Sequence, residues 1–260
     1  MVRAVQIPHF PEANHPLVQA LAQRSDQDLL TLFQRYPEQG CYFAAIFCRY
    51  TPVVYTLVQH SVSSPVQADY LFAVTWRHLY YELGGLDLHR SDPSNPTKAT
   101  LQSWLIQVTA QCINQAQLPP VEAIAYNLEA APPVLWCYIY QSLDRIDPLN
   151  RLILIMGETF RWSETRISAY LRAEGENLAP AEVRQRLEVA QADLLADLPQ
   201  DIREIYLPAP IAANLAPFTP SPQSPSLSGS ASGSSAAALN TAPKSRFSPL
   251  AESLAAGFAL

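Results

Sequence analysis

Residues 66–83 read VQADYLFAVTWRHLYYEL, a long stretch of apolar and aromatic side chains. Tyr70, Val74 and Tyr81 fall along one row when this stretch is placed on a helix. Two glycines follow directly, and glycine commonly ends a helix because it adopts the left-handed conformation without strain. The stretch therefore predicts a long helix, and it makes a helical protein the first hypothesis.

Comparable helix signals extend outward in both directions. Ser25 and Thr100 are expected to cap helices, Asp147-Pro148 to start one, and Pro180 to open another. The chain has 260 residues but only 8 glycines, which argues against a β protein with many tight turns. We predict an all-α fold with helices at residues 25–34, 42–50, 53–60, 66–83, 101–117, 134–143, 147–156, 164–171 and 180–198.

Proline-rich stretches divide the chain into parts. From Pro208 to Phe247 the sequence is rich in Pro, Ser and Ala, a composition that buries too little apolar surface to fold. Beyond it, Leu250, Leu254 and Phe258 fall four apart, as on one face of a short helix. We expect an extended arm at 1–16, a helical domain at 17–118, a linker at 119–133, a second helical domain at 134–207, a disordered segment at 208–247 and an amphipathic helix at 248–260.

The net charge and the cysteine pattern limit the partners, the metal chemistry and the cellular location that we expect for this protein. The formal net charge of -6 does not suggest a general nucleic-acid coat, although a local basic face can be masked in the total. The 4 cysteines form no CxxC pair and sit among apolar residues, so we expect buried free thiols and no metal site. We see no apolar run long enough to cross a bilayer and no signal peptide. We therefore expect a cytoplasmic protein with no membrane partner and no cofactor.

Three stretches carry an ordered set of motifs. They are Arg49-Tyr50, Val54-Tyr55 and Gln67-Ala68-Asp69-Tyr70-Leu71 in the first, Ser103-Trp104-Leu105-Ile106 in the second, and residues 143–198 in the third. In order and spacing this set resembles the two-region sigma factors of bacterial RNA polymerase, in the extracytoplasmic-function group. The resemblance covers roughly residues 25 to 200. It implies a region-two-like bundle at 17–118 and a region-four-like helix-turn-helix domain at 134–207.

The resemblance implies a transcription initiation factor that binds core RNA polymerase and directs it to promoter DNA. Its implied polymerase-binding residues are Asp69, Tyr70, Ala73, Trp76 and Arg77. Implied DNA contacts come from the promoter-melting helix and from the helix-turn-helix, whose recognition helix reads base edges in the major groove. These residues are Trp104, Gln107, Gln111, Arg172, Arg184, Gln185 and Arg186.

The sequence departs from the family pattern where the function needs it most. Phe72 and Ala73 replace a Gln-Glu pair in the polymerase-docking helix. Residues 111–117, which end the melting helix, contain no cation, and the turn of the helix-turn-helix is about five residues longer than usual. Residues 158–197 hold arginines at 161, 166, 172, 184 and 186 against acids at 158, 164, 174, 176, 182, 188, 193 and 197. Fewer phosphate contacts should weaken DNA binding.

Two other functions are considered. The first is a sigma-like interaction regulator, which binds polymerase, another sigma factor or an anti-sigma protein without reading DNA. The second is an enzyme, and it finds little support. None of the five histidines has a nucleophile or carboxylate at motif spacing, and neither a phosphate-binding glycine loop nor HExxH occurs. We therefore expect a protein that is not an enzyme.

Overall fold

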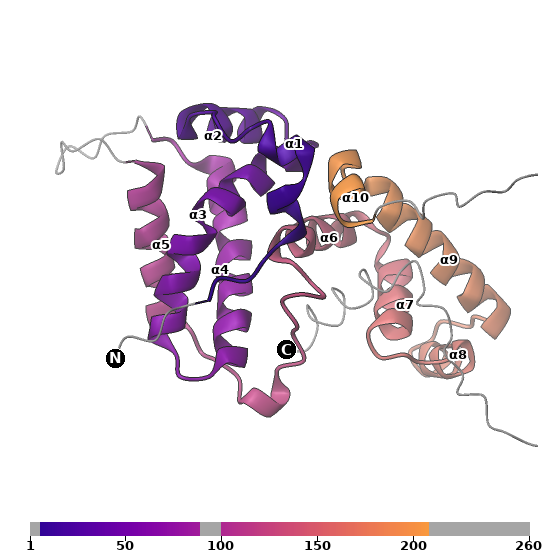
Figure 1. The fold of residues 1–260 in the computed structure, drawn as a ribbon. Coiled ribbons are helices and arrows are strands. Elements are labelled where there is room, and N and C mark those ends of the chain that lie inside the picture. The colour runs from indigo at the N-terminus through magenta and orange to yellow at the C-terminus, as the bar shows by residue number, and fades with distance from the viewer. Residues whose placement is uncertain (1–5, 89–99, 208–260) are drawn as a thin grey trace, which may run out of the picture.

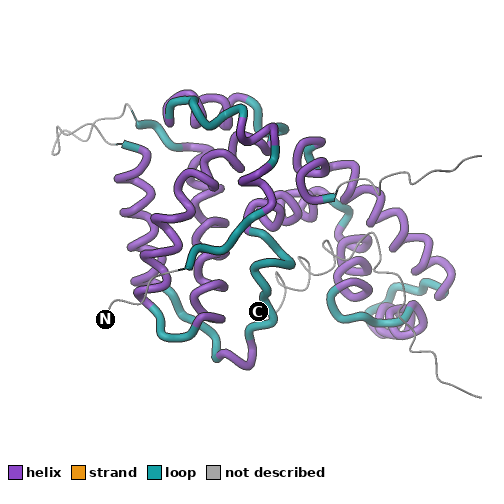
Figure 2. Tube along the Cα trace, in the orientation of Figure 1, coloured by secondary structure: helices purple, strands orange, loops and turns teal. Residues whose placement is uncertain are grey.

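The computed structural model describes residues 6–88 and 100–207, and within these ranges every regular element is a helix (Figures 1 and 2). The all-α prediction is confirmed. The segments predicted at 208–247 and 248–260 lie outside the described residues. The elements are η1 (Pro11–Asn14), α1 (Pro16–Gln19), α2 (Asp26–Arg35), α3 (Gly40–Ser61), α4 (Pro65–Gly85), α5 (Leu101–Gln115), η2 (Val121–Ala123), α6 (Pro133–Arg145), α7 (Pro148–Glu158), α8 (Glu164–Ala173), α9 (Pro180–Asp197) and α10 (Gln200–Tyr206).

Side-chain caps start several helices where the sequence predicted them. The Ser25 hydroxyl accepts from the backbone N–H of Asp28 at 3.1 Å, at the start of α2. Thr100 and Ser103 form a reciprocal capping box at the start of α5. Asp147 accepts from the first backbone N–H groups of α7. These caps satisfy donors that a helix leaves unpaired at its first turn.

Helix α3 corrects one prediction. Residues 42–50 and 53–60 were expected to be separate helices, but they form one helix of 22 residues with Pro52 inside it. The merged helix is also long and apolar enough to cross a membrane by length and composition, which contradicts the expectation that no such run exists. More than half of the apolar window is buried inside the fold, and core helices pass the same test. The error came from treating Pro52 as a break.

A large aromatic core surrounds α4. Phe43 and Phe47 from α3, together with Phe72 and Trp76 from α4, are fully buried, and the Phe47 and Trp76 ring centroids lie 4.8 Å apart. Helices α2, α3, α5 and α6 all contact α4 (Figure 1). The stretch that first indicated the fold is therefore the central helix of the molecule. Edge-to-face pairing of such rings adds stability beyond the area they bury.

This core continues through the segment predicted as a linker. Tyr126 and Leu128 are buried in it, and Trp136 and Tyr138 of α6 join the same cluster of buried residues. The Tyr80 hydroxyl of α4 donates to the Gln141 side chain of α6 at 3.0 Å. One hydrophobic core thus spans both predicted domains, because α6 packs on α4.

The N-terminal arm is only partly extended. Residues 6–10 are irregular, whereas η1 and α1 follow as short helices. Phe10 is buried against Phe47 and Phe72, with ring centroids 5.0 and 6.1 Å away. Helix α10, which the sequence did not reveal, packs on both α3 and η1. Since Phe10 is the apolar anchor, the arm is part of the core and not a free extension.

Candidate polymerase- and DNA-binding surfaces

Helices α7, α8 and α9 form a three-helix unit with a small core of its own. Ile153, Met156, Ile167, Leu171 and Val183 make up this core. Each pair of the three helices is in contact, and in Figure 1 the unit lies at one end of the molecule. Helices α8 and α9 are joined by a turn and braced by α7.

The long turn between α8 and α9 is tied down locally. Gly175 reverses the chain with a φ of 97°, a conformation that favours glycine. The Ser168 hydroxyl of α8 donates to the Leu178 carbonyl at 2.6 Å. The Glu182 carboxylate accepts from the Ala179 backbone N–H at 2.7 Å, which caps the start of α9. The turn is longer than in the family pattern, but the bond from Ser168 holds its end against α8.

The three predicted DNA residues of α9 differ in what they already contact. Gln185 is exposed. Arg184 is exposed and pairs with Glu164 of α8 at 3.3 Å. The Arg186 guanidinium is half-buried and donates to the Asn150 side chain of α7 at 3.0 Å. Arg186 therefore braces α9 on α7, and it would have to give up this bond to read a base.

Two arginines of α8 are better placed to meet an anion. Arg172, which was predicted, and Arg166, which was not, are both exposed, and neither forms an ion pair with another described residue. Arg166 lies over the Trp162 ring at 4.1 Å from the centroid. Phe160 and Tyr170 flank that tryptophan and are 51% and 41% exposed. The sequence signal that could have identified this surface was an aromatic residue, Trp162, directly before the N-cap Ser163, with Arg166 in the first turn of the helix.

The predicted promoter-melting residues lie along α5. Trp104 is half-buried against the large core, whereas Gln107 and Gln111 are exposed on the helix surface. At three and four residues apart, the three side chains share one face. This surface carries no charge. Figure 1 shows α5 at the opposite end of the molecule from α8 and α9.

Most of the predicted polymerase-binding residues are inside the protein. Tyr70, Ala73 and Trp76 are buried in the large core, so they cannot contact a partner in this fold. Asp69 is half-buried, and it accepts from the Tyr55 hydroxyl at 3.0 Å. Burial raises the pKa of Asp69, and the hydrogen bond from Tyr55 opposes that rise. The prediction is corrected for the three buried residues, because α3, α6 and Tyr126, from the segment between α5 and α6, pack on α4.

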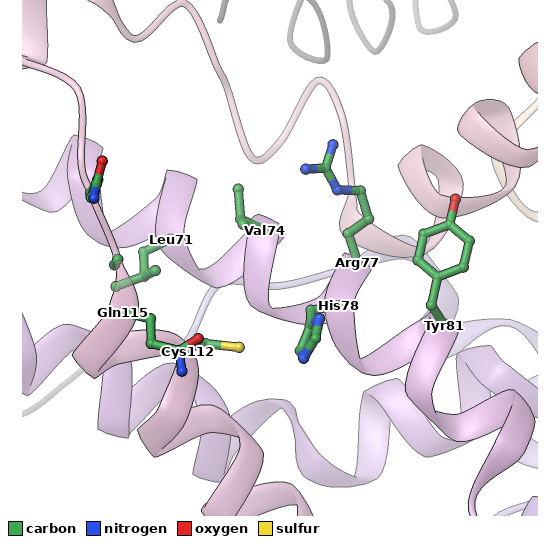
Figure 3. A pocket seen from close by; sticks show the side chains of 9 residues that line it. Leu71, Val74, Arg77, His78, Tyr81, Cys112 and Gln115 are labelled. Atoms are coloured by element: carbon green, nitrogen blue, oxygen red, sulfur yellow. The ribbon is translucent and has the colours of Figure 1, made fainter.

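Arg77 remains near the surface, but its side chain also packs on aromatic rings of α6. Its guanidinium lies 4.8 Å from the Trp136 ring centroid and 5.0 Å from that of Tyr140, both on α6. Such cation–π contacts help to hold α6 on α4. Arg77 also lines a groove between α4 and the end of α5, shown in Figure 3, which has a volume of about 410 Å³.

No family model matches the chain, and neither a curated protein nor a solved structure matches it.

Proposed function

We propose that this protein is a sigma-like transcription initiation factor that binds core RNA polymerase and directs it to promoter DNA. The observation that carries the proposal is the α7–α9 unit, a helix-turn-helix arrangement with its own core and two arginines on α8 free of ion pairs. In such motifs the second helix enters the major groove while neighbouring side chains hold phosphates.

The position of α5 supports the same proposal. An uncharged row of Trp104, Gln107 and Gln111 suits single-stranded bases, which stack on aromatic rings and bond to amides without a need for cations. Its distance from the α7–α9 unit, at the other end of the molecule, suits two separate promoter elements (Figure 1). Base recognition on α5 and duplex recognition on α8 and α9 would then act on different parts of one promoter.

Polymerase binding on this proposal uses the exposed edge of α4. Arg77 and Tyr81 lie one turn apart on that edge, His78 directly follows Arg77, and Tyr81 is 52% exposed. A pull-down of the full chain with core polymerase tests this surface. We expect the double substitution His78→Glu/Tyr81→Ala to weaken capture, whereas Gln27→Glu on exposed α2 should leave it unchanged. Equal capture of both variants and the parent chain would place the polymerase contact elsewhere.

Several residues that the resemblance assigned to polymerase docking are buried. Their burial favours a second candidate function, an interaction regulator that binds polymerase, another sigma factor or an anti-sigma protein without reading DNA. Phe72 and Ala73 are fully buried where the family pattern has polar residues, and α6 packs against the same helix. Retained polymerase capture, with no binding of the full chain to any promoter duplex at low salt, would favour this function over the first.

A further inference from the structure

The groove between α4 and α5 leaves apolar side chains uncovered at the edge of the large core. Leu71, Val74 and Tyr81 line it from α4, and Cys112 of α5 and Ala116, which directly follows α5, line it from the other side. Tyr81 is 52% exposed, although its side chain is large and mostly apolar. Figure 3 shows the Arg77 and His78 side chains on the same helix, beside these apolar groups. A partly apolar groove with basic groups at its edge suits an amphipathic helix that has little positive charge of its own.

The chain itself supplies a segment with this character. In residues 248–260, Leu250, Leu254 and Phe258 recur every four residues, and four of the other ten positions are alanines. Glu252 is the one charged residue of the segment, so its sign is opposite to that of Arg77. A helix this short is marginal by itself in water and gains stability from a surface that covers its apolar face.

The length of chain before the segment allows it to reach the groove. Residues 208–247 give 40 residues between α10 and the segment, and their only charges are Lys244 and Arg246. A flexible chain of that length has a root-mean-square span of roughly 35 Å, comparable to the width of a small domain. Tethering also gives the segment an effective concentration on the order of 1 mM at its own groove.

We propose that residues 248–260 dock as an amphipathic helix in the α4–α5 groove of the same chain. Leu254 lies at the centre of the contact, and Leu250 and Phe258 lie one turn to either side. The groove includes Arg77, His78 and Tyr81, so a docked segment covers the edge of α4 assigned to polymerase. Competition with polymerase rests on the proposed function, whereas the docking itself does not.

Cys112 reports on the groove, because it lines it and is half-buried. We would label the full chain with N-ethylmaleimide and follow each cysteine by peptide mass spectrometry. With an effective concentration of about 1 mM and a dissociation constant of about 0.1 mM, docking slows labelling of Cys112 by roughly tenfold. Leu254→Asp/Phe258→Asp should remove this protection, and Ala256→Asp, on the opposite face of the segment, should keep it. Cys41 should react equally in all variants.

A cross-link gives a second measurement. With an added mild oxidant to accept the two electrons, Leu254→Cys should form a disulfide with Cys112 within one chain, and should do so faster than Ala256→Cys. Equal Cys112 labelling in every variant, together with equal cross-linking of the two cysteine variants, would overturn the docking. Protection that rises with protein concentration, or a cross-linked dimer, would assign the groove to a second copy and overturn docking within the chain. Neither measurement contains polymerase, so failure of the docking is distinguishable from failure of the proposed function.

Discussion

Arginine side chains of the α7–α9 unit differ in how much of their hydrogen bonding is already used. Arg186 is bound to Asn150 at 3.0 Å, and Arg184 pairs with Glu164 at 3.3 Å. Arg166 and Arg172 are exposed and form no ion pair with another described residue. On the proposed function, a phosphate gains most from a cation that gives up no partner, so Arg172 would be a stronger anchor than Arg184 or Arg186, whereas Arg166 would first have to leave the Trp162 ring.

We therefore expect Arg172→Ala to weaken binding to all DNA sequences alike. Loss of one phosphate contact should also reduce the slope of log affinity against log salt by about one. Gel shifts of the full chain over a salt series measure both effects. Arg35→Ala removes the same charge from an exposed position of α2 and serves as the control. An unchanged affinity and slope for Arg172→Ala would contradict this assignment.

Glu12 is a residue whose titration should affect stability. It is fully buried in η1, and neither carboxylate oxygen has a well-formed hydrogen bond, although the Tyr206 hydroxyl of α10 lies near enough to interact. Burial raises its pKa from 4.5 to about 7, while its own backbone N–H and Tyr206 lower the pKa in part. Cys48 of α3 is near enough for the charge of Glu12 to raise the pKa of its thiol.

A raised folded-state pKa means that the folded protein holds the Glu12 proton more tightly than the unfolded chain does. Its contribution to stability is fully present below pH 4.5 and is lost as the pH rises through about 7. The loss amounts to about 3 kcal/mol at 1.36 kcal/mol per pKa unit. Glu12→Gln should therefore unfold with a smaller pH dependence in urea between pH 5 and 8. The same pH dependence as the parent chain would show that Glu12 is not the responsible group.

At the scale of elements, α10 completes the start of α3. The N-cap residue of α3, Gln39, provides no side-chain cap, and instead Asp201 of α10 accepts from the backbone N–H groups of Gly40 and Cys41 at 3.1 and 2.6 Å. Gly40 is needed there, because a Cβ would lie 2.2 Å from the Ile202 side chain. The carboxylate also meets the positive end of the α3 dipole.

We expect Asp201→Ala to lower the free energy of unfolding by about 1–2 kcal/mol, the usual cost of a lost helix cap. Chemical denaturation followed by far-UV circular dichroism measures the change. Glu204→Ala removes an exposed carboxylate from the same helix and is the matched control. Equal stability of the two variants would mean that water replaces Asp201 at no cost.

Local signals in the sequence were enough to predict most helices, and long-range contacts explain the rest. Caps such as Ser25 and Asp147 act within a few residues, so they can be recognised without the fold. The Asp201 cap joins residues about 160 positions apart, and no local pattern indicates it. Pro52 was misread because a proline can be accommodated inside a helix when tertiary packing compensates for the lost bond.

Long-range contacts also limited how well the site residues could be predicted from the sequence. The helical spacing of residues on α4 could be read from the sequence, but their exposure depends on what packs against the helix. Helices α3 and α6 pack on α4, and Tyr70, Ala73 and Trp76 are buried. On α5 the core around α4 covers only one side, so Gln107 and Gln111 lie at the surface as expected. A charged residue such as Arg186 can likewise be used for bracing, which its sequence position does not indicate.

At the scale of the whole molecule, continuity of the core predicts cooperative unfolding. The large core runs from Phe10 to Tyr206 and includes Trp76 and Trp136, while Trp162 packs on the small core of the α7–α9 unit. Leu187 of α9 packs against both cores. We therefore expect one transition in urea, with tryptophan fluorescence and far-UV circular dichroism coinciding. Two separated transitions would indicate that the α7–α9 unit unfolds independently.

The central claim, that this chain is a sigma-like initiation factor, is tested most directly by run-off transcription. Core polymerase would be combined with the full chain, a library of promoter templates and, as a matched control, the Arg172→Ala variant. The proposal predicts transcripts with a defined start that depend on the chain and weaken with the variant. Core polymerase that gives no chain-dependent transcript from any template, even though the chain is correctly folded, would contradict it.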